Sequence, residues 1–148
     1  MKKHTELPSN KVYAIGSFWN YTETPMAGLR AASIVESVAA KEGLYIYSLI
    51  EGSDEKAQND SKINFLKTQM NTAKILKADY FITGEVQEWR YKTGIDGEPV
   101  VSYSIKIIKL DDGSTQFNGV GAKNGWGYKS IGVIAQEIAK ELLPTFKP

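Results

Sequence analysis

Residues Ala78–Tyr91 carry the sequence ADYFITGEVQEWRY, and the character of this stretch changes halfway along it. Its first part, from Tyr80 to Ile82, is an apolar run of the kind found in strands that are covered on both faces. From Gly84 onward polar residues alternate with apolar ones, which is typical of a strand with one face in water. The stretch therefore predicts one long strand that begins deep in a sheet and runs out beyond it.

The chain before this strand predicts strands that alternate with helices. Lys11–Phe18 is a near-continuous apolar run, which indicates a first buried strand, and residues 19–23 are expected to form a loop after it. Thr24-Pro25 predicts a helix start, because a hydroxyl can cap the helix and proline suits its first position. Gly43 is expected to terminate this helix, and Leu44–Ile50 to form a second strand after a right-handed crossover. The apolar face of the helix is expected to comprise Ala27, Ala31, Ile34, Val35 and Val38.

A second helix is expected immediately before the long strand. It follows a polar, charged loop over residues 51–61, in which Asp60 or Ser61 can serve as the N-cap. The apolar stripe of this helix is expected to comprise Ile63, Leu66, Met70, Ala73 and Leu76.

The chain after the long strand predicts an antiparallel meander that ends in a last helix. Asp96-Gly97 and Asp111-Asp112-Gly113 are turn signals, so each following strand should fold back on its predecessor. Thr115–Ala122 is a weaker strand whose two glycines suit an edge or a close approach of backbones. The strand between the turns is expected to place Val101, Tyr103, Ile105 and Ile107 on one face, and Ser102, Ser104 and Lys106 on the other.

These signals together predict an α/β fold. The expected element order is β-α-β-α-β-β-β-α, in a single domain whose mixed five-stranded sheet is flanked by helices. Residues 1–10 are expected to form a flexible N-terminal segment, and residues 11–146 a single α/β domain. A chain of 148 residues is long enough to give such a domain a substantial core.

The composition argues against several classes of function. The chain has no cysteine and a single histidine, His4, so thiolate metal sites and a cysteine nucleophile are excluded and a histidine-based triad is not expected. A net charge of +1 with scattered lysines gives no indication of a nucleic-acid partner. No apolar run is long enough to span a bilayer. Met1-Lys2-Lys3 resembles the start of a signal peptide, but His4–Lys11 supplies no apolar segment, as expected for a mature chain without its targeting segment.

No group of residues predicts catalysis. Gly119-Val120-Gly121 lacks the third glycine and the strand–helix turn of a phosphate-binding loop. Glu85 and Glu88 are three residues apart on an extended strand, so they are expected to point to opposite faces. Asp111 and Asp112 precede a glycine and are explained by turn chemistry. We therefore expect no enzymatic activity, no metal and no cofactor.

Two loops carry aromatic residues that could serve binding. Trp126, flanked by glycines and followed by Tyr128, can fold back over the sheet edge, or it can stay exposed for a membrane interface or a partner subunit. Trp19 and Tyr21 lie at the C-terminal end of a predicted parallel strand, where open α/β sheets tend to bind ligands. Packing of this second aromatic pair against the first helix is the favoured alternative.

Acidic residues mark the tip of the first predicted hairpin. Asp96 and Glu98 flank Gly97, and the Asp-Gly pair by itself indicates a turn. In a closed ring of identical subunits, however, such acids would recur once per subunit. They would then form an electronegative collar able to interact with a cationic polymer.

Three stretches together carry a resemblance to a known family. They are Asn20–Ala31 (NYTETPMAGLRA), Gly84–Lys92 (GEVQEWRYK) with Asp96–Pro99, and Gly125-Trp126 with the final helix. The chain resembles the PelC lipoproteins of the bacterial Pel exopolysaccharide secretion system, over nearly its whole length from Lys11 to Leu143. More distantly, its element order is similar to that of the TolB N-terminal domain and of its relatives CsgG and LpoB.

This resemblance implies a protein held by a lipid at the periplasmic face of the outer membrane. It implies a ring of about twelve copies at the mouth of the Pel outer-membrane export porin, through which the polysaccharide passes. Trp126 and Tyr128 would contact the membrane. Asp96 and Glu98 would line the ring opening and guide a partly deacetylated, cationic polysaccharide. The chain departs from the family pattern in having no cysteine to carry the lipid.

Two functions therefore remain to be separated. The first is a non-enzymatic ring component of a polysaccharide exporter. The second is a monomeric periplasmic interaction module of the TolB or LpoB kind, which would bind or activate an envelope protein. The first predicts self-association, whereas the second predicts no closed oligomer.

Overall fold

The structure of this chain is a computed structural model. It describes residues 5–51, 61–93, 97–125 and 129–148. Asp96, Trp126 and Tyr128 lie outside these ranges, and so does His4.

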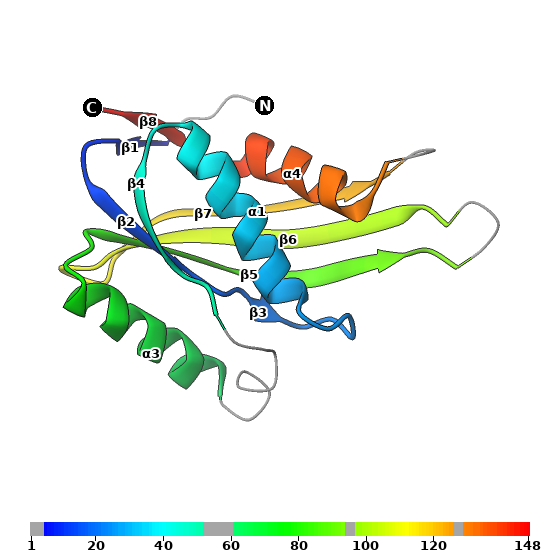
Figure 1. Cartoon of the computed structure of the whole chain (residues 1–148), viewed down its shortest axis with the longest axis horizontal. Helices are drawn as coiled ribbons and strands as arrows, with labels where there is room; N and C mark the ends of the chain where they lie inside the picture. The colour runs from blue at the N-terminus through cyan, green and yellow to red at the C-terminus, as the bar shows by residue number, and fades with distance from the viewer. Residues whose placement is uncertain (1–4, 52–60, 94–96, 126–128) are drawn as a thin grey trace.

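A mixed sheet forms the centre of the molecule, with the strand order β4-β2-β5-β6-β7 (Figure 1). Neighbours run parallel in the first half of this order, because helical crossovers connect them, and antiparallel in the second half, where turns connect them. The predicted α/β class and element order are thus confirmed. The strands are β2 (Val12–Gly16), β4 (Tyr45–Leu49), β5 (Tyr80–Tyr91), β6 (Pro99–Lys109) and β7 (Thr115–Asn124).

Helices cover the two faces of the sheet unequally. Helices α1 (Ala27–Lys41) and α4 (Ile131–Leu142) lie together over one face, where they enclose the main core with Tyr103 and Ile105 of β6. Helix α3 (Lys62–Ile75) lies apart from them and covers a smaller cluster on the other face (Figure 1). The face under α1 and α4 is called the inner face below, and the face under α3 the outer face.

The long strand β5 has the two-part character that its sequence predicts. Its residues from Tyr80 to Gly84 are buried, and exposed positions appear only from Gln87 onward. Its far end continues with β6 as a hairpin that projects beyond the helices (Figure 1). A β-bulge interrupts the pairing between Val86 and Glu88, so that Gln87 is an extra residue with no partner in β6.

The start of α1 differs from the prediction. Trp19-Asn20, expected in a loop, forms a short strand β3 (Trp19–Asn20) that pairs in parallel with β5, so the sheet has six strands. The helix begins at Ala27 after Met26, which has a φ of 64° and makes no side-chain cap. Thr24 is not the N-cap because its hydroxyl donates instead to the carbonyl of Trp89 in β5.

The two ends of the chain form a pair that the sequence did not predict. Residues 1–10 were expected to be flexible, but β1 (Glu6–Pro8) pairs in parallel with β8 (Thr145–Lys147). Leu7 is buried in the main core, and the hydroxyl of Tyr13 donates to the carbonyl of Pro8 at 2.6 Å. The prediction is therefore corrected for β1, whose three residues are too few for a pattern to indicate.

Helix α3 is capped as expected but less buried than expected. Ser61 accepts a hydrogen bond from the Asn64 amide at 3.1 Å, which confirms one of the two predicted caps. Of the predicted stripe only Ala73 is buried, and Ile63 is 72% exposed. The reason is that α3 covers the sheet only around Phe81, so its first turn extends beyond the apolar part of the outer face.

Candidate functional site

The described residues that flank the predicted membrane and hairpin residues lie at one end of the molecule. Asp96, Trp126 and Tyr128 are outside the described residues, and the structure places only their flanks. The Gly125 amide donates to the Pro99 carbonyl at 2.8 Å, so the chain leading to Trp126 meets the base of the hairpin that carries Asp96. Both segments thus leave the described structure at the end where the hairpin projects (Figure 1).

Glu98 is the one member of the predicted acidic pair that the structure describes. Its carboxylate lies 3.8 Å from the ammonium of Lys92 across the hairpin, and the Lys92 amide donates to the Glu98 carbonyl at 2.7 Å. The Glu98 side chain is only 25% exposed. Its negative charge is therefore partly compensated within its own subunit.

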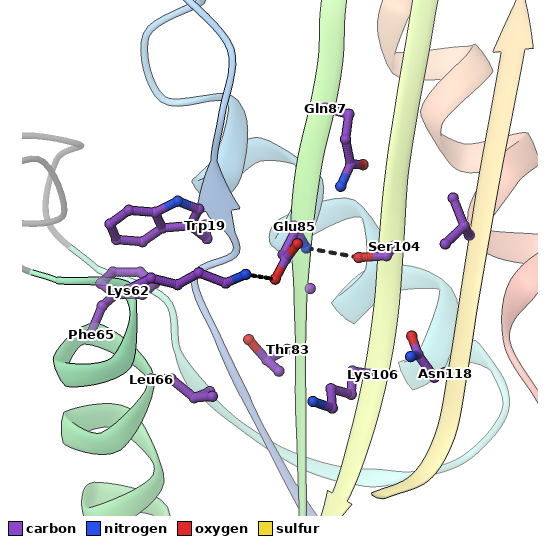
Figure 2. A pocket seen from close by; sticks show the side chains of 12 residues that line it. Trp19, Lys62, Phe65, Leu66, Thr83, Glu85, Gln87, Ser104, Lys106 and Asn118 are labelled. Atoms are coloured by element: carbon purple, nitrogen blue, oxygen red, sulfur yellow. Dashed lines mark hydrogen bonds and ion pairs between the residues drawn. The ribbon is translucent and has the colours of Figure 1, made fainter.

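A second candidate site is a cavity of about 320 Å³ on the outer face of the sheet (Figure 2). One of its sides is aromatic, with Trp19 from β3 and Phe65 from α3, whose rings meet edge to face at 5.3 Å. Its floor and far side are mostly polar and come from three adjacent strands. They comprise Thr83, Glu85 and Gln87 of β5, Ser104 and Lys106 of β6, and Asn118 of β7.

An ion pair joins α3 to the floor of this outer-face cavity. The ammonium of Lys62 contacts the carboxylate of Glu85 and also donates to the hydroxyl of Tyr21 at 2.9 Å. The Glu85 carboxylate, followed by the Tyr21 hydroxyl, raises the pKa of Lys62. The Glu85 amide donates to the hydroxyl oxygen of Ser104 at 3.2 Å. Glu85 is thus fixed by both its backbone and its side chain.

Other polar groups in the outer-face cavity have no partner among the described residues. The side chains of Gln87, Asn118 and Lys106 make no hydrogen bond or ion pair within that part of the chain. The same holds for the hydroxyl of Thr83, although this residue is only 8% exposed. Gln87 and Asn118 are exposed to water, and Lys106 and Thr83 line the same cavity. These four groups are therefore available to a polar ligand that displaces water.

The expected placement of Glu85 and Glu88 was wrong. Glu85 and Glu88 were expected on opposite faces, but the bulge at Gln87 shifts the alternation by one residue. Glu85 therefore pairs with Ser104 and Glu88 with Ser102, and both glutamates lie on the outer face. A bulge of this kind leaves no reliable mark in the alternation of residues.

The position of Trp19 was also wrong. It was expected to pack against the first helix, but its ring contacts Phe65 of α3. Parallel pairing with β5 places Trp19 beside Glu85, and so turns the indole to the outer face, away from α1. The ligand-binding alternative for this residue is consistent with its place at the cavity.

The described residues contain no group of three or more histidine, cysteine, aspartate or glutamate side chains that could hold a metal ion. None of the helices in those residues has the length and apolar character needed to cross a membrane.

Comparison with known proteins places this fold. No protein-family model matches the chain, and no curated protein matches it. Among solved structures, lipoprotein GNA1162 from Neisseria meningitidis aligns with a TM-score of 0.60 at 13% identity, covering 88% of this chain and 96% of that one. The LpoB C-terminal domain from Salmonella enterica aligns with a TM-score of 0.52 at 13% identity, covering 79% and 84%. The chain thus has the single α/β domain fold of these proteins.

A much closer likeness identifies the family. A PelC dodecamer from Paraburkholderia phytofirmans aligns with a TM-score of 0.79 at 32% identity, over 100% of this chain and 96% of that one. A second PelC dodecamer from the same organism gives 0.76 and 29%, over 92% and 86%. The chain belongs to the PelC family, as its sequence had indicated.

Proposed function

We propose that this protein is a ring-forming, non-enzymatic component of Pel exopolysaccharide export at the periplasmic side of the outer membrane. The observation that carries this proposal is the 32% identity over the whole chain to a protein whose structure is a dodecamer. The alignment covers 100% of this chain and 96% of the relative, so this one domain accounts for almost all of the relative's structure.

In this proposal the ring guides a cationic polysaccharide toward the Pel export porin. Glu98 lies beside the hairpin that projects from the subunit, and Asp96 precedes it by two residues in the sequence. Twelve copies of these acids would gather their charge around one opening. Lys92 lies 3.8 Å from Glu98 and compensates part of the charge of that carboxylate. Trp126 and Tyr128 would contact the membrane surface, to which the full-length protein is anchored by a lipid.

The native mass in solution tests the ring directly. We expect multi-angle light scattering to give twelve times the chain mass of 16.4 kDa, constant over a concentration series. A closed ring should show this single species, whereas an open assembly should show a ladder of masses. A chain that stays monomeric at every concentration, and also on phosphatidylethanolamine–phosphatidylglycerol vesicles, would overturn the proposal.

Vesicles of the same composition test the membrane role. Trp126→Ala should weaken vesicle flotation and leave the native mass unchanged, because a loop residue at the membrane does not hold subunits together. Tyr45→Ala is a matched control, since this exposed aromatic lies on the edge strand β4. Equal flotation of the Trp126 variant and the original protein would remove the membrane contact from the proposal.

The alternative of a monomeric interaction module rests on fold alone. The LpoB domain shares 13% of its residues with this chain, and a likeness at that level carries no function. A monomer in the mass experiment is the result that would bring this alternative forward.

A further inference from the structure

The outer-face cavity combines features that neither the ring nor the hairpin requires. It has a half-buried indole at one side and unused amide groups at the other, over a floor held in place by the Lys62–Glu85 pair. Figure 2 shows these side chains facing a common space from β3, α3, β5 and β7. The polar groups come from three strands of one sheet, so their spacing is set by the sheet and not by a loop.

We propose that this cavity is a saccharide-binding site that takes an uncharged pyranose unit. This proposal rests on the proposed function, because it names the uncharged units of the polymer as ligands in addition to the charged groups that the ring would attract. A pyranose ring has an apolar face of C–H groups and an edge of hydroxyl groups. A site for it therefore needs an aromatic surface and, at right angles to that surface, groups that both donate and accept hydrogen bonds.

The aromatic side of the cavity supplies the first requirement. Trp19 is fixed by its strand pairing with β5 and by its edge-to-face contact with Phe65. A fixed indole loses little conformational entropy when a ligand packs on it. Leu66 of α3 and Val120 of β7 extend the apolar surface, and Val120 is 68% exposed although it is a large aliphatic residue.

The polar floor supplies the second requirement. Gln87 and Asn118 each offer an amide that can donate and accept hydrogen bonds, as the hydroxyl groups of a sugar require. The strand register places the two amides at different levels of the sheet, so each would meet a different part of the ligand. Thr83 is 8% exposed, and its hydroxyl has no hydrogen-bond partner among the described residues. Because this residue lines the cavity, its hydroxyl is available to a ligand hydroxyl. Gln87 shares the outer face with Glu85, two residues earlier in β5, and so lines the same cavity.

The charges of the cavity select against a free amine. Glu85 is the one carboxylate that lines it, and Lys62 contacts and neutralises that group. Lys106 remains as a cation without a partner in the described residues, so the cavity carries a net positive charge. A protonated amino sugar would meet this cation, whereas a hydroxyl or acetamido group would not. The cavity thus suits the neutral units of a polymer whose charged units the hairpin attracts.

A pair of probes that differ in N-acetylation, and therefore in charge, tests the selectivity. The full chain is titrated with the tetramer of N-acetylglucosamine and with the tetramer of glucosamine, and binding is followed by calorimetry. We expect the neutral tetramer to bind at least about tenfold more tightly, equivalent to roughly 1.4 kcal/mol. Lys106→Gln should reduce this preference by improving the binding of the charged tetramer.

Matched variants locate the site. Trp19→Ala should abolish binding of the neutral tetramer, and Asn118→Ala should weaken it by about tenfold, as expected for one hydrogen bond. Asn118 is exposed on the edge strand β7, so its variant keeps the fold even if loss of the indole does not. Tyr45→Ala, which removes an exposed aromatic from the opposite edge of the sheet, should bind normally.

The outcomes separate this inference from the proposed function. Absence of binding by the neutral tetramer, or unchanged binding by folded Trp19 and Asn118 variants, overturns the saccharide site. The native mass of the same samples reports on the ring independently. A twelve-subunit mass without binding would reject the site and leave the ring, whereas a monomer that binds the neutral tetramer would keep the site and reject the ring.

Discussion

At the scale of single residues, Gly28 shows how closely α1 approaches the sheet. The Phe18 amide donates to the Gly28 carbonyl at 3.2 Å, and a Cβ atom at position 28 would overlap the carbonyl oxygen of Phe18. Because the carbonyl group of Phe18 belongs to the backbone, no side-chain movement can make room for this Cβ atom. The contact explains why a glycine stands in the first turn of this helix.

Gly28→Ala should therefore destabilise the fold by about 2–3 kcal/mol, as measured by urea unfolding. Gly132→Ala is the matched control in α4, where the nearest atom to an added Cβ is the Ser130 hydroxyl oxygen at 3.8 Å. That change should stabilise the protein by up to about 1 kcal/mol, because alanine is the better helix former. A Gly28 variant as stable as the original would refute the close approach.

Asp112 gives the turn between β6 and β7 a dependence on pH. Its carboxylate accepts from the Ser114 hydroxyl at 2.6 Å and from the Ser114 amide at 2.9 Å, and these bonds lower its pKa. A lowered pKa contributes stability at pH values above the unfolded value of about 3.9, and this is lost as pH falls through the folded value. Asp112→Ala should lower the Tm at pH 7, and the difference should shrink below about pH 4.

A second variant checks the cause of this pH dependence. Ser114→Ala removes the hydroxyl donor and leaves the amide donor, so part of the same pH-dependent difference in Tm should disappear. A Tm difference for Asp112→Ala that stayed constant from pH 7 to pH 3 would show that the carboxylate charge plays no part.

At the scale of elements, the β1–β8 pair joins the two ends of the chain to the core. Leu7 is 6% exposed within β1, and Phe146 of β8 packs edge-on against Tyr13 at 5.6 Å. Leu7→Ala should cost about 2–4 kcal/mol in urea unfolding, since it leaves a cavity at a buried site. Glu6→Ala in the same strand should cost less than about 1 kcal/mol, because its bond to Lys147 at 3.2 Å is exposed. If Leu7→Ala and Glu6→Ala had equally small effects on the free energy of unfolding, the β1–β8 pair would be only loosely attached to the core.

The elements also show what sequence patterns can predict. Helices and strands with a clear period were predicted, including β5, whose change of character from Tyr80 to Tyr91 reflects a real change of burial. The glycines of β7 were correctly linked to an edge strand. The close neighbour at Gly121 is the Ile138 side chain, 2.8 Å from an added Cβ, and not another backbone. Periodicity reports burial, and it succeeds where a long element has one buried face.

The missed elements share a different physical origin. β3 has two residues and β1 and β8 have three each, and their pairing depends on partners far away in the chain. Thr24 has the composition of a cap, yet a bond to Trp89 in another strand decides its role. The outer-face cavity depends on Trp19, and the shared face of Glu85 and Glu88 depends on the bulge at Gln87. Both features are set by strand pairing and not by local pattern. Tertiary contacts override local preference at such positions.

At the scale of the whole molecule, charge is the quantity that a ring would change most. The chain has a formal net charge of +1, so it carries no excess of acid that would attract a cation to the monomer. In the proposed ring, the projecting hairpins would bring many carboxylates within one another's range of about 10 Å at moderate salt. Guidance of a cationic polymer would therefore be a property of the assembly and not of the subunit.

The Lys92–Glu98 pair makes this idea testable, because its two members should act in opposite directions. In the original protein the ammonium of Lys92 lies 3.8 Å from the carboxylate of Glu98. Lys92→Gln removes this compensating charge, so it should tighten binding of the glucosamine tetramer to the assembled protein. Glu98→Gln should weaken that binding, and Asp96→Asn should weaken it more. All three effects should fade between about 0.05 and 0.5 M salt, because screening shortens the range of exposed charges.

Lys123→Gln is the control, because it removes a cation that is paired with Glu141 of α4 at 2.6 Å. This variant should have less effect than Lys92→Gln. Weaker binding by the Lys92 variant, or effects that persist at high salt, would place the polymer elsewhere on the ring.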